Sequence, residues 1–151
     1  MPQHLVPKLF WTSVETLTIR PTSVSVLMLL IGLTIFGLGE ALLIAAGVGV
    51  SPWTVLAQGV SKHWACSIGT STAAISACVL LLWLPLKQIP GLGTFLNIVV
   101  IALVIDFSLP YLPNFETTIL KVLLAATGVF VTGVGGAIYL ISNLGPGPRD
   151  G

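Results

Sequence analysis

Four long apolar stretches, nearly free of charged residues, constrain this chain more than any other feature of its sequence. They cover residues 24–47, 67–84, 92–109 and 119–142. Only 7% of the 151 residues are charged, whereas a soluble domain carries about 25%. A helix that spans a membrane needs about 20 apolar residues. The sequence therefore predicts an all-α, polytopic transmembrane helix bundle with four spanning helices, embedded in a lipid bilayer.

Two shorter segments complete the expected organisation. The apolar run 52–60 would cover about 14 Å as a helix, about half a membrane. Because Ser51 suits a helix cap and Pro52 a first helical turn, we expect a short re-entrant or interfacial helix over 51–61. Residues 1–22 form an N-terminal interfacial segment, either a short helix anchored by Trp11 or a frayed tail, and 23–151 form the transmembrane domain.

The first and fourth apolar stretches match each other at a fixed offset of 96 residues. The identical pairs are Gly32/Gly128, Gly37/Gly133, Gly39/Gly135, Ala41/Ala137, Gly49/Gly145 and Pro52/Pro148. Both copies end in a break rich in glycine and proline, and paired breaks of this kind are typical of transporter sites. Because three spans separate the starts of the two copies, the second would enter the membrane from the opposite side. The sequence thus predicts inverted topology for spans one and four.

The second copy stops three residues after Pro148, whereas the first copy continues into a short helix and two further spans. From this difference we expect a missing C-terminal segment. A homo-oligomer is the alternative that could supply its contacts.

The motifs of these regions resemble a known family. They are "GLGEALLIAAGVGVSPWTVLAQGVS", "GLGTFLNIVVIALVIDFSLP" and "ISNLGPGPRDG". Residues 24–151 resemble the YczE-like family of bacterial integral membrane proteins, which is grouped with the broader YitT-type families. Two departures are Thr54, where an Asp often follows Pro-Trp, and Glu40 inside span one. The resemblance implies the membrane fold and further apolar segments downstream, and it implies no particular activity.

Several polar residues are candidates for solute binding. A carboxylate at Glu40 would be costly against lipid, so we expect it to face protein or water, either as a proton- or cation-coupling group or as a protonated, hydrogen-bonded side chain. Asn97 could bind solute or bridge helices. At the two helix breaks, the N-terminus of the following helix would attract anions, and Arg149 would add hydrogen-bond donors. The alternative is that the residues of these breaks only cap helices and that the charged ones are solvated. The predicted binding set is Glu40, Ser51, Trp53, Asn97, Arg149 and Asp150.

Other classes of function receive no support from the sequence. A net charge of +1 argues against nucleic-acid binding. The chain carries no Gly-x-Ser-x-Gly, phosphate-binding loop or His-Glu-x-x-His signature. Cys66 and Cys78 form no metal-binding pattern. We therefore expect no enzyme activity, no metal and no cofactor.

Flanking charges predict the orientation in the membrane. Four positive residues fall on one side of a four-span arrangement and two on the other. They are Lys8, Arg20, Lys87 and Arg149 on one side, and Lys62 and Lys121 on the other. We expect a multi-pass protein of the inner (plasma) membrane with a cytoplasmic N-terminus. The predicted function is transport of a small polar or anionic solute; the alternative is a membrane scaffold or regulatory protein that transports nothing.

Overall fold

The computed structural model describes residues 9–18 and 20–148, which form α-helices, one short 3-10 helix and no β-strand. The elements in chain order are α1 (Ser23–Ala46), α2 (Pro52–Trp64), α3 (Ile68–Trp83), α4 (Leu92–Ser108), η2 (Leu109–Tyr111) and α5 (Thr118–Ile141). Each predicted apolar stretch becomes one helix, with bounds that shift by a residue at most. The short helix begins at Pro52 as expected and runs three residues longer than predicted.

Within residues 9–18 and 20–148, three helical segments are long and apolar enough to cross a membrane: α1, α4 together with η2, and α5. The pair α2 and α3 is bent by 112° and makes a fourth span only when both helices are taken together. With 16 residues, α3 alone reaches about 24 Å, short of the roughly 30 Å hydrocarbon core. The described residues therefore hold three candidate spans, or four if the bent pair counts as one, and the second predicted span is too short to stand alone.

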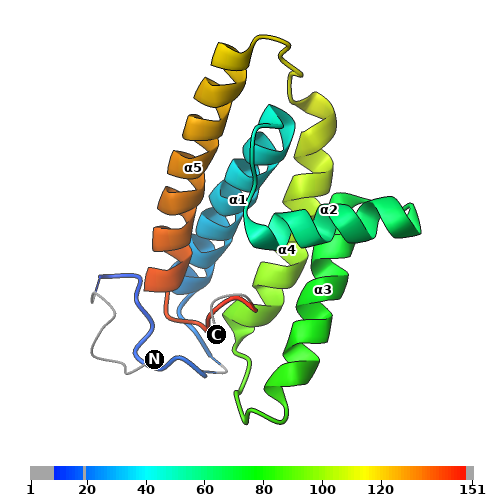
Figure 1. Cartoon of the computed structure of the whole chain (residues 1–151). Helices are drawn as coiled ribbons and strands as arrows, with labels where there is room; N and C mark the ends of the chain where they lie inside the picture. The colour runs from blue at the N-terminus through cyan, green and yellow to red at the C-terminus, as the bar shows by residue number, and fades with distance from the viewer. Residues whose placement is uncertain (1–8, 19, 149–151) are drawn as a thin grey trace.

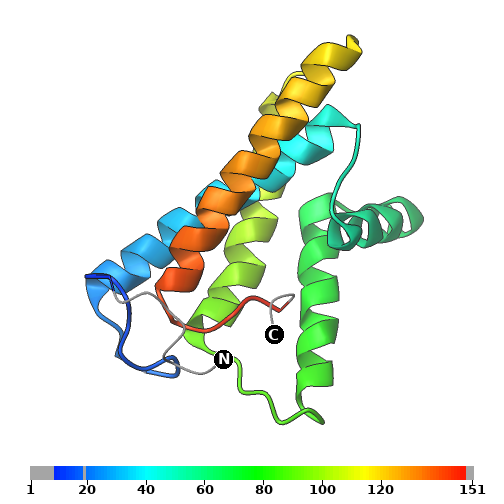
Figure 2. The same cartoon turned by 60° about the vertical axis from the view of Figure 1, so that its left-hand side comes forward.

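The helices pack around α1. Helices α1 and α5 lie side by side and run in opposite directions (Figure 1), and this pair makes the most extensive contact in the described structure. Helix α4 packs on another side of α1, and α3 packs on α4. Helix α2 packs on α3 and lies roughly perpendicular to it, and in the second view it extends away from the other helices (Figure 2).

Four glycines allow the close approach of α1 and α5. A Cβ added at Gly32 would lie 3.0 Å from the carbonyl oxygen of Gly135, and one added at Gly39 would lie 2.9 Å from that of Gly128. Added Cβ atoms on Gly128 and Gly135 would likewise crowd the backbone of α1. Small residues at such positions let membrane helices pack backbone against backbone.

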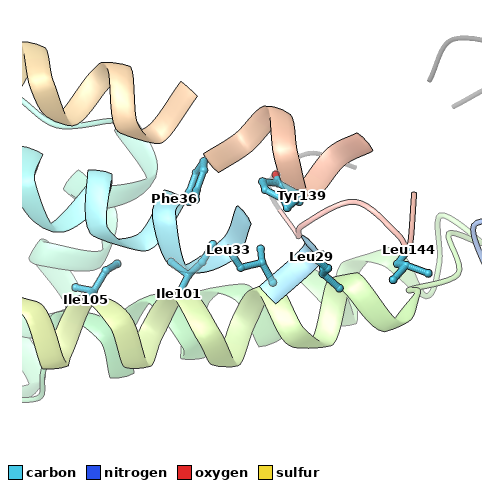
Figure 3. Close-up of a cluster of buried hydrophobic side chains, with 7 residues drawn as sticks. All are labelled: Leu29, Leu33, Phe36, Ile101, Ile105, Tyr139 and Leu144. Atoms are coloured by element: carbon cyan, nitrogen blue, oxygen red, sulfur yellow. The ribbon is translucent and has the colours of Figure 1, made fainter. Parts of the chain in front are cut away.

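A cluster of buried apolar side chains joins α1, α4 and α5 (Figure 3). Phe36 meets Tyr139 edge to face, with ring centroids 5.7 Å apart. The members of the cluster are Leu29, Leu33, Phe36, Ile101, Ile105, Tyr139 and Leu144. Because Leu144 follows α5, this cluster also fixes the chain where that helix ends.

The N-terminal segment forms no helix between residues 9 and 18, in contrast to one of the two predictions made for it. Its backbone instead bonds to the end of α5. The Ser13 N–H donates to the Ser142 carbonyl at 3.0 Å, and the Asn143 amide donates to the Ser13 carbonyl at 2.9 Å. These tertiary hydrogen bonds satisfy backbone groups that a helix would otherwise pair.

Helix α3 is held at its N-terminus by a carboxylate from α4. The Asp106 side chain accepts hydrogen bonds from the Gly69 N–H at 2.7 Å and from the Ser67 hydroxyl at 2.5 Å. A negative charge at this end also interacts favourably with the helix dipole. Asp106 thereby couples α3 to α4.

Replacing Asp106 by alanine is expected to lower the free energy of unfolding by about 1–2 kcal/mol, because two hydrogen bonds to a charged acceptor are lost. The measurement is reversible unfolding of the purified protein in detergent, with Glu116→Ala at an exposed position as the control. Equal stability of both variants would contradict the capping role.

Candidate functional site

The first helix break follows α1 and leads into α2. Gly47 adopts the left-handed conformation, with φ of 65°, and ends α1. Ser51 caps α2, and its hydroxyl accepts from the Thr54 N–H at 3.3 Å. Pro52 occupies the first helical position, where the absence of an N–H costs nothing. The break therefore places the N-terminus of α2 beside α1.

A chain of polar side chains connects α1 to this cap. The Thr54 hydroxyl donates to Glu40 Oε2 at 2.7 Å. The hydroxyls of Thr54 and Ser51 lie 2.9 Å apart and share a hydrogen bond. Glu40 is only 3% exposed and Thr54 only 4%. Glu40 thus faces protein, as the sequence required of a carboxylate within an apolar helix.

The second helix break follows α5 and docks on the start of α4. Asn143 and Gly145 have positive φ angles of 54° and 111°. The Gly93 N–H donates to the Leu144 carbonyl at 2.7 Å, and the Thr94 hydroxyl donates to the Pro146 carbonyl at 2.7 Å. Since carbonyls after a helix end lack helical partners, α4 satisfies the ones that this break exposes.

Residues from both breaks line one small cavity. Trp53 comes from the first break and Pro148 from the second. Between them lie Thr72 and Ser76 of α3 together with Asn97 and Ile101 of α4. The space open to the centre of a water molecule is about 10 Å³, which is enough for about one water.

The cavity offers hydrogen-bonding groups of both kinds. Asn97 is 5% exposed, and its Nδ2 has no hydrogen-bond partner among the described residues. The hydroxyls of Thr72 and Ser76 donate to backbone carbonyls of their own helix at 2.8 Å each. Their oxygens can still accept, so the cavity combines a free amide donor with hydroxyl acceptors. Its described lining carries no charge.

The structure separates the predicted binding set into three parts. Trp53 and Asn97 line the cavity. Glu40 and Ser51 belong to the polar chain next to it, since both bond to Thr54, the residue that follows Trp53. Arg149 and Asp150 lie outside the described residues.

The predicted set omitted Thr54, Thr72 and Ser76. Thr54 stands three residues after the Ser51 cap, a position whose side chain commonly shares in capping. Thr72 and Ser76 are four residues apart and share one helix face. Both spacings can be seen in the sequence, but neither shows which helix the face would meet.

No group of three His, Cys, Asp or Glu side chains with metal-binding geometry occurs in the part of the chain that the structure describes. Cys66 and Cys78 are free thiols.

Comparison with known proteins places the chain in a family. The family described as "Family of unknown function (DUF6198)" matches residues 23–151. A Haemophilus influenzae protein, described as uncharacterized, is 38% identical over 148 residues, which are 98% of this chain and 67% of that protein. The Bacillus subtilis uncharacterized membrane protein YczE is 31% identical over 121 residues, which are 79% of this chain and 56% of YczE.

The chain belongs to the YczE-like family of membrane proteins. This confirms the resemblance that the sequence motifs indicated. The chain spans about two thirds of the first relative and just over half of the second. No solved structure matches it. Its apolar helices agree with a multi-pass YczE-like membrane protein.

Proposed function

We propose that this YczE-like protein carries a small polar solute across the inner membrane at the junction of its two helix breaks. The observation that carries the proposal is the shared cavity: Trp53 of one break and Pro148 of the other line it together with the unpartnered amide of Asn97. Binding sites between broken helices in matching halves are typical of secondary transporters.

An inverted repeat of α1 and α5 is part of this proposal. The two helices are antiparallel (Figure 1), as opposite crossing directions require. Their glycine contacts also follow the 96-residue offset. Gly32 contacts Gly135, and the residues equivalent to these two, Gly128 and Gly39, contact each other as well. The left-handed residues that follow the two helices, Gly47 and Asn143, are equivalent as well. A pseudo-two-fold axis between α1 and α5 would produce these relations.

The solute that fits the described lining is polar and uncharged. The amide donor of Asn97 and the hydroxyl acceptors of Thr72 and Ser76 suit a compact molecule with both donors and acceptors. Preference for an anion would rest on Arg149, which lies outside the described residues. Because the cavity has room for only about one water, passage of a solute would require α2 and α3 to move relative to α4.

Glu40 is proposed to couple this movement to a proton. Its hydrogen bond with Thr54 ties α1 to the cap of α2, and Thr54 can bond in either direction with Ser51. A protonated Glu40 could donate to Thr54, whereas the carboxylate can only accept. Protonation would therefore reverse the hydrogen bonds at the start of α2.

The orientation with a cytoplasmic N-terminus remains part of the proposal. The start of α1 and the loop after α3 lie at the same end of the bundle (Figure 1), so Arg20 and Lys87 belong to one side. Together with Lys8 and Arg149, which lie outside the described residues, they would give that side the excess of positive charge that favours the cytoplasm.

The second candidate is a scaffold that transports nothing, and the size of the cavity favours it. A site with room for about one water could simply be a hydrated polar contact that joins three helices. The two functions differ in whether any solute crosses.

The test is solute entry into liposomes that contain the purified protein, followed by light scattering with urea, glycerol and glycine as probes. Asn97→Leu is expected to slow the entry of the transported probe about tenfold, since one hydrogen bond of roughly 1.4 kcal/mol is lost. Phe95→Leu, two residues earlier and 54% exposed, is the control and should leave entry unchanged. Entry rates equal to those of empty liposomes for every probe would support the scaffold instead.

A further inference from the structure

Equivalent positions of α1 and α5 differ sharply in what covers them. A Cβ added at Gly37 would lie 3.0 Å from Val104 of α4, whereas its counterpart Gly133 has nothing within 4 Å. Leu33 is fully buried, and its counterpart Val129 is 63% exposed. One face of α1 packs on α4. The corresponding face of α5 is therefore exposed in the described structure.

The two helix breaks differ in the same way. Gly145 of the second break lies against Gly91, the residue that caps α4, and against Thr94 of α4. Its counterpart Gly49 in the first break has no neighbour within 4 Å of an added Cβ. Helix α4 thus contacts both α1 and the second break, in addition to α3. At the counterpart positions, Gly133 on α5 and Gly49 in the first break, none of the described residues would touch an added Cβ.

One apolar stripe on the exposed surface of α5 corresponds to the face of α1 that packs on α4. The residues that form it lie three, four, four and seven positions apart and so share one helix face. They are Val122, Ala125, Val129, Gly133 and Leu140, and we call them the open stripe. Small residues such as Ala125 and Gly133 favour helix-on-helix packing over contact with lipid alone.

We infer that the open stripe and the first helix break are the docking site for one more membrane helix, the counterpart of α4. The inference rests on the inverted repeat in the proposed function, because the pseudo-two-fold axis that relates α1 to α5 carries α4 onto this surface. Its N-terminal turn would meet Val48 and Gly49, just as Gly91 and Thr94 meet the second break.

The occupant is a helix that the longer relatives carry outside the matched region. The Haemophilus influenzae relative matches 98% of this chain with only 67% of its own length. The remaining third, about 70 residues if 148 residues are 67%, is long enough for two spans of about 20 residues. In the repeat, the counterpart of α4 belongs downstream of the second break.

The test co-expresses the intact chain with the part of the Haemophilus influenzae relative that lies outside the matched region, as a separate tagged polypeptide. A photo-crosslinking amino acid replaces Val129 in the open stripe. The control position is Leu123, which is 58% exposed and about 120° away around the helix axis. With the crosslinking amino acid at position 129, we expect a crosslink to the tagged segment. With the same amino acid at position 123, we expect none.

A second variant separates docking from folding. Gly133→Leu has open space in this chain, so the protein should fold normally while the crosslink from position 129 disappears. A crosslink from 129 to a second copy of the chain, or to lipid only, would overturn the inference. The crosslinking measurement needs no solute. A crosslink can therefore be found even if no solute is transported, and transport can be found even if no crosslink forms.

Discussion

Replacing Gly135 by alanine is expected to lower the free energy of unfolding by about 2–3 kcal/mol, because the added carbon would overlap backbone atoms of α1. The new Cβ would lie 2.7 Å from the Cα of Phe36 and 2.8 Å from the carbonyl oxygen of Gly32. Both are backbone atoms of α1, so relief requires the two helices to separate. Separation would also loosen the contact of Phe36 with Tyr139.

Gly133→Ala is the matched control, on the same helix and two residues away. Its Cβ would enter open space, and alanine is the better helix former, so no loss of stability is expected. Unfolding of both variants in detergent, followed by circular dichroism, gives the comparison. Similar losses of stability for both variants would mean that the close contact between the glycines of α1 and α5 does not stabilise the bundle.

Replacing Thr54 by valine is expected to cost about 1.5–3 kcal/mol of stability, because a buried carboxyl group loses a hydrogen-bond donor. The side chains have nearly the same shape, so the change removes the hydrogen bonds to Glu40 at 2.7 Å and to Ser51 at 2.9 Å without opening a cavity. The cap of α2 should loosen as well, since Ser51 then relies on the backbone N–H of residue 54.

Thr34→Val provides the control for this change. Thr34 is exposed on α1, and among the described residues its hydroxyl bonds locally, to the Leu30 carbonyl at 2.8 Å. A double-mutant cycle of Thr54→Val with Glu40→Gln measures the coupling between the two side chains. Additive losses would show that the hydrogen bond contributes nothing to stability, and the proposed link between α1 and the start of α2 would fail.

Most helix boundaries could be predicted because the signals that set them are local. Ser51 with Pro52 begins α2, and Gly47 ends α1, each through its own backbone or side chain. The bend between α2 and α3 could not be predicted in the same way. Its 112° angle follows from packing: Asp106 of α4 holds the start of α3, while Glu40 of α1 holds the start of α2.

The candidate site was only partly visible in the sequence for a similar reason. Glu40 and Asn97 stood out because polar groups are rare in apolar stretches. Thr72 and Ser76 did not, since hydroxyl groups in membrane helices commonly bond to their own backbone, as both do here. Their importance depends on lying opposite Asn97 in one cavity.

By itself, the sequence determined that this chain is a helical membrane protein, where its helices begin and end, and which two of them share a glycine pattern. These properties depend on near neighbours along the chain and on the cost of burying charge in lipid. Only the tertiary structure decided that the glycines of α1 and α5 meet face to face, that Thr54 reaches Glu40, and that both breaks border one cavity. Such contacts join residues from different helices, and helix packing selects them.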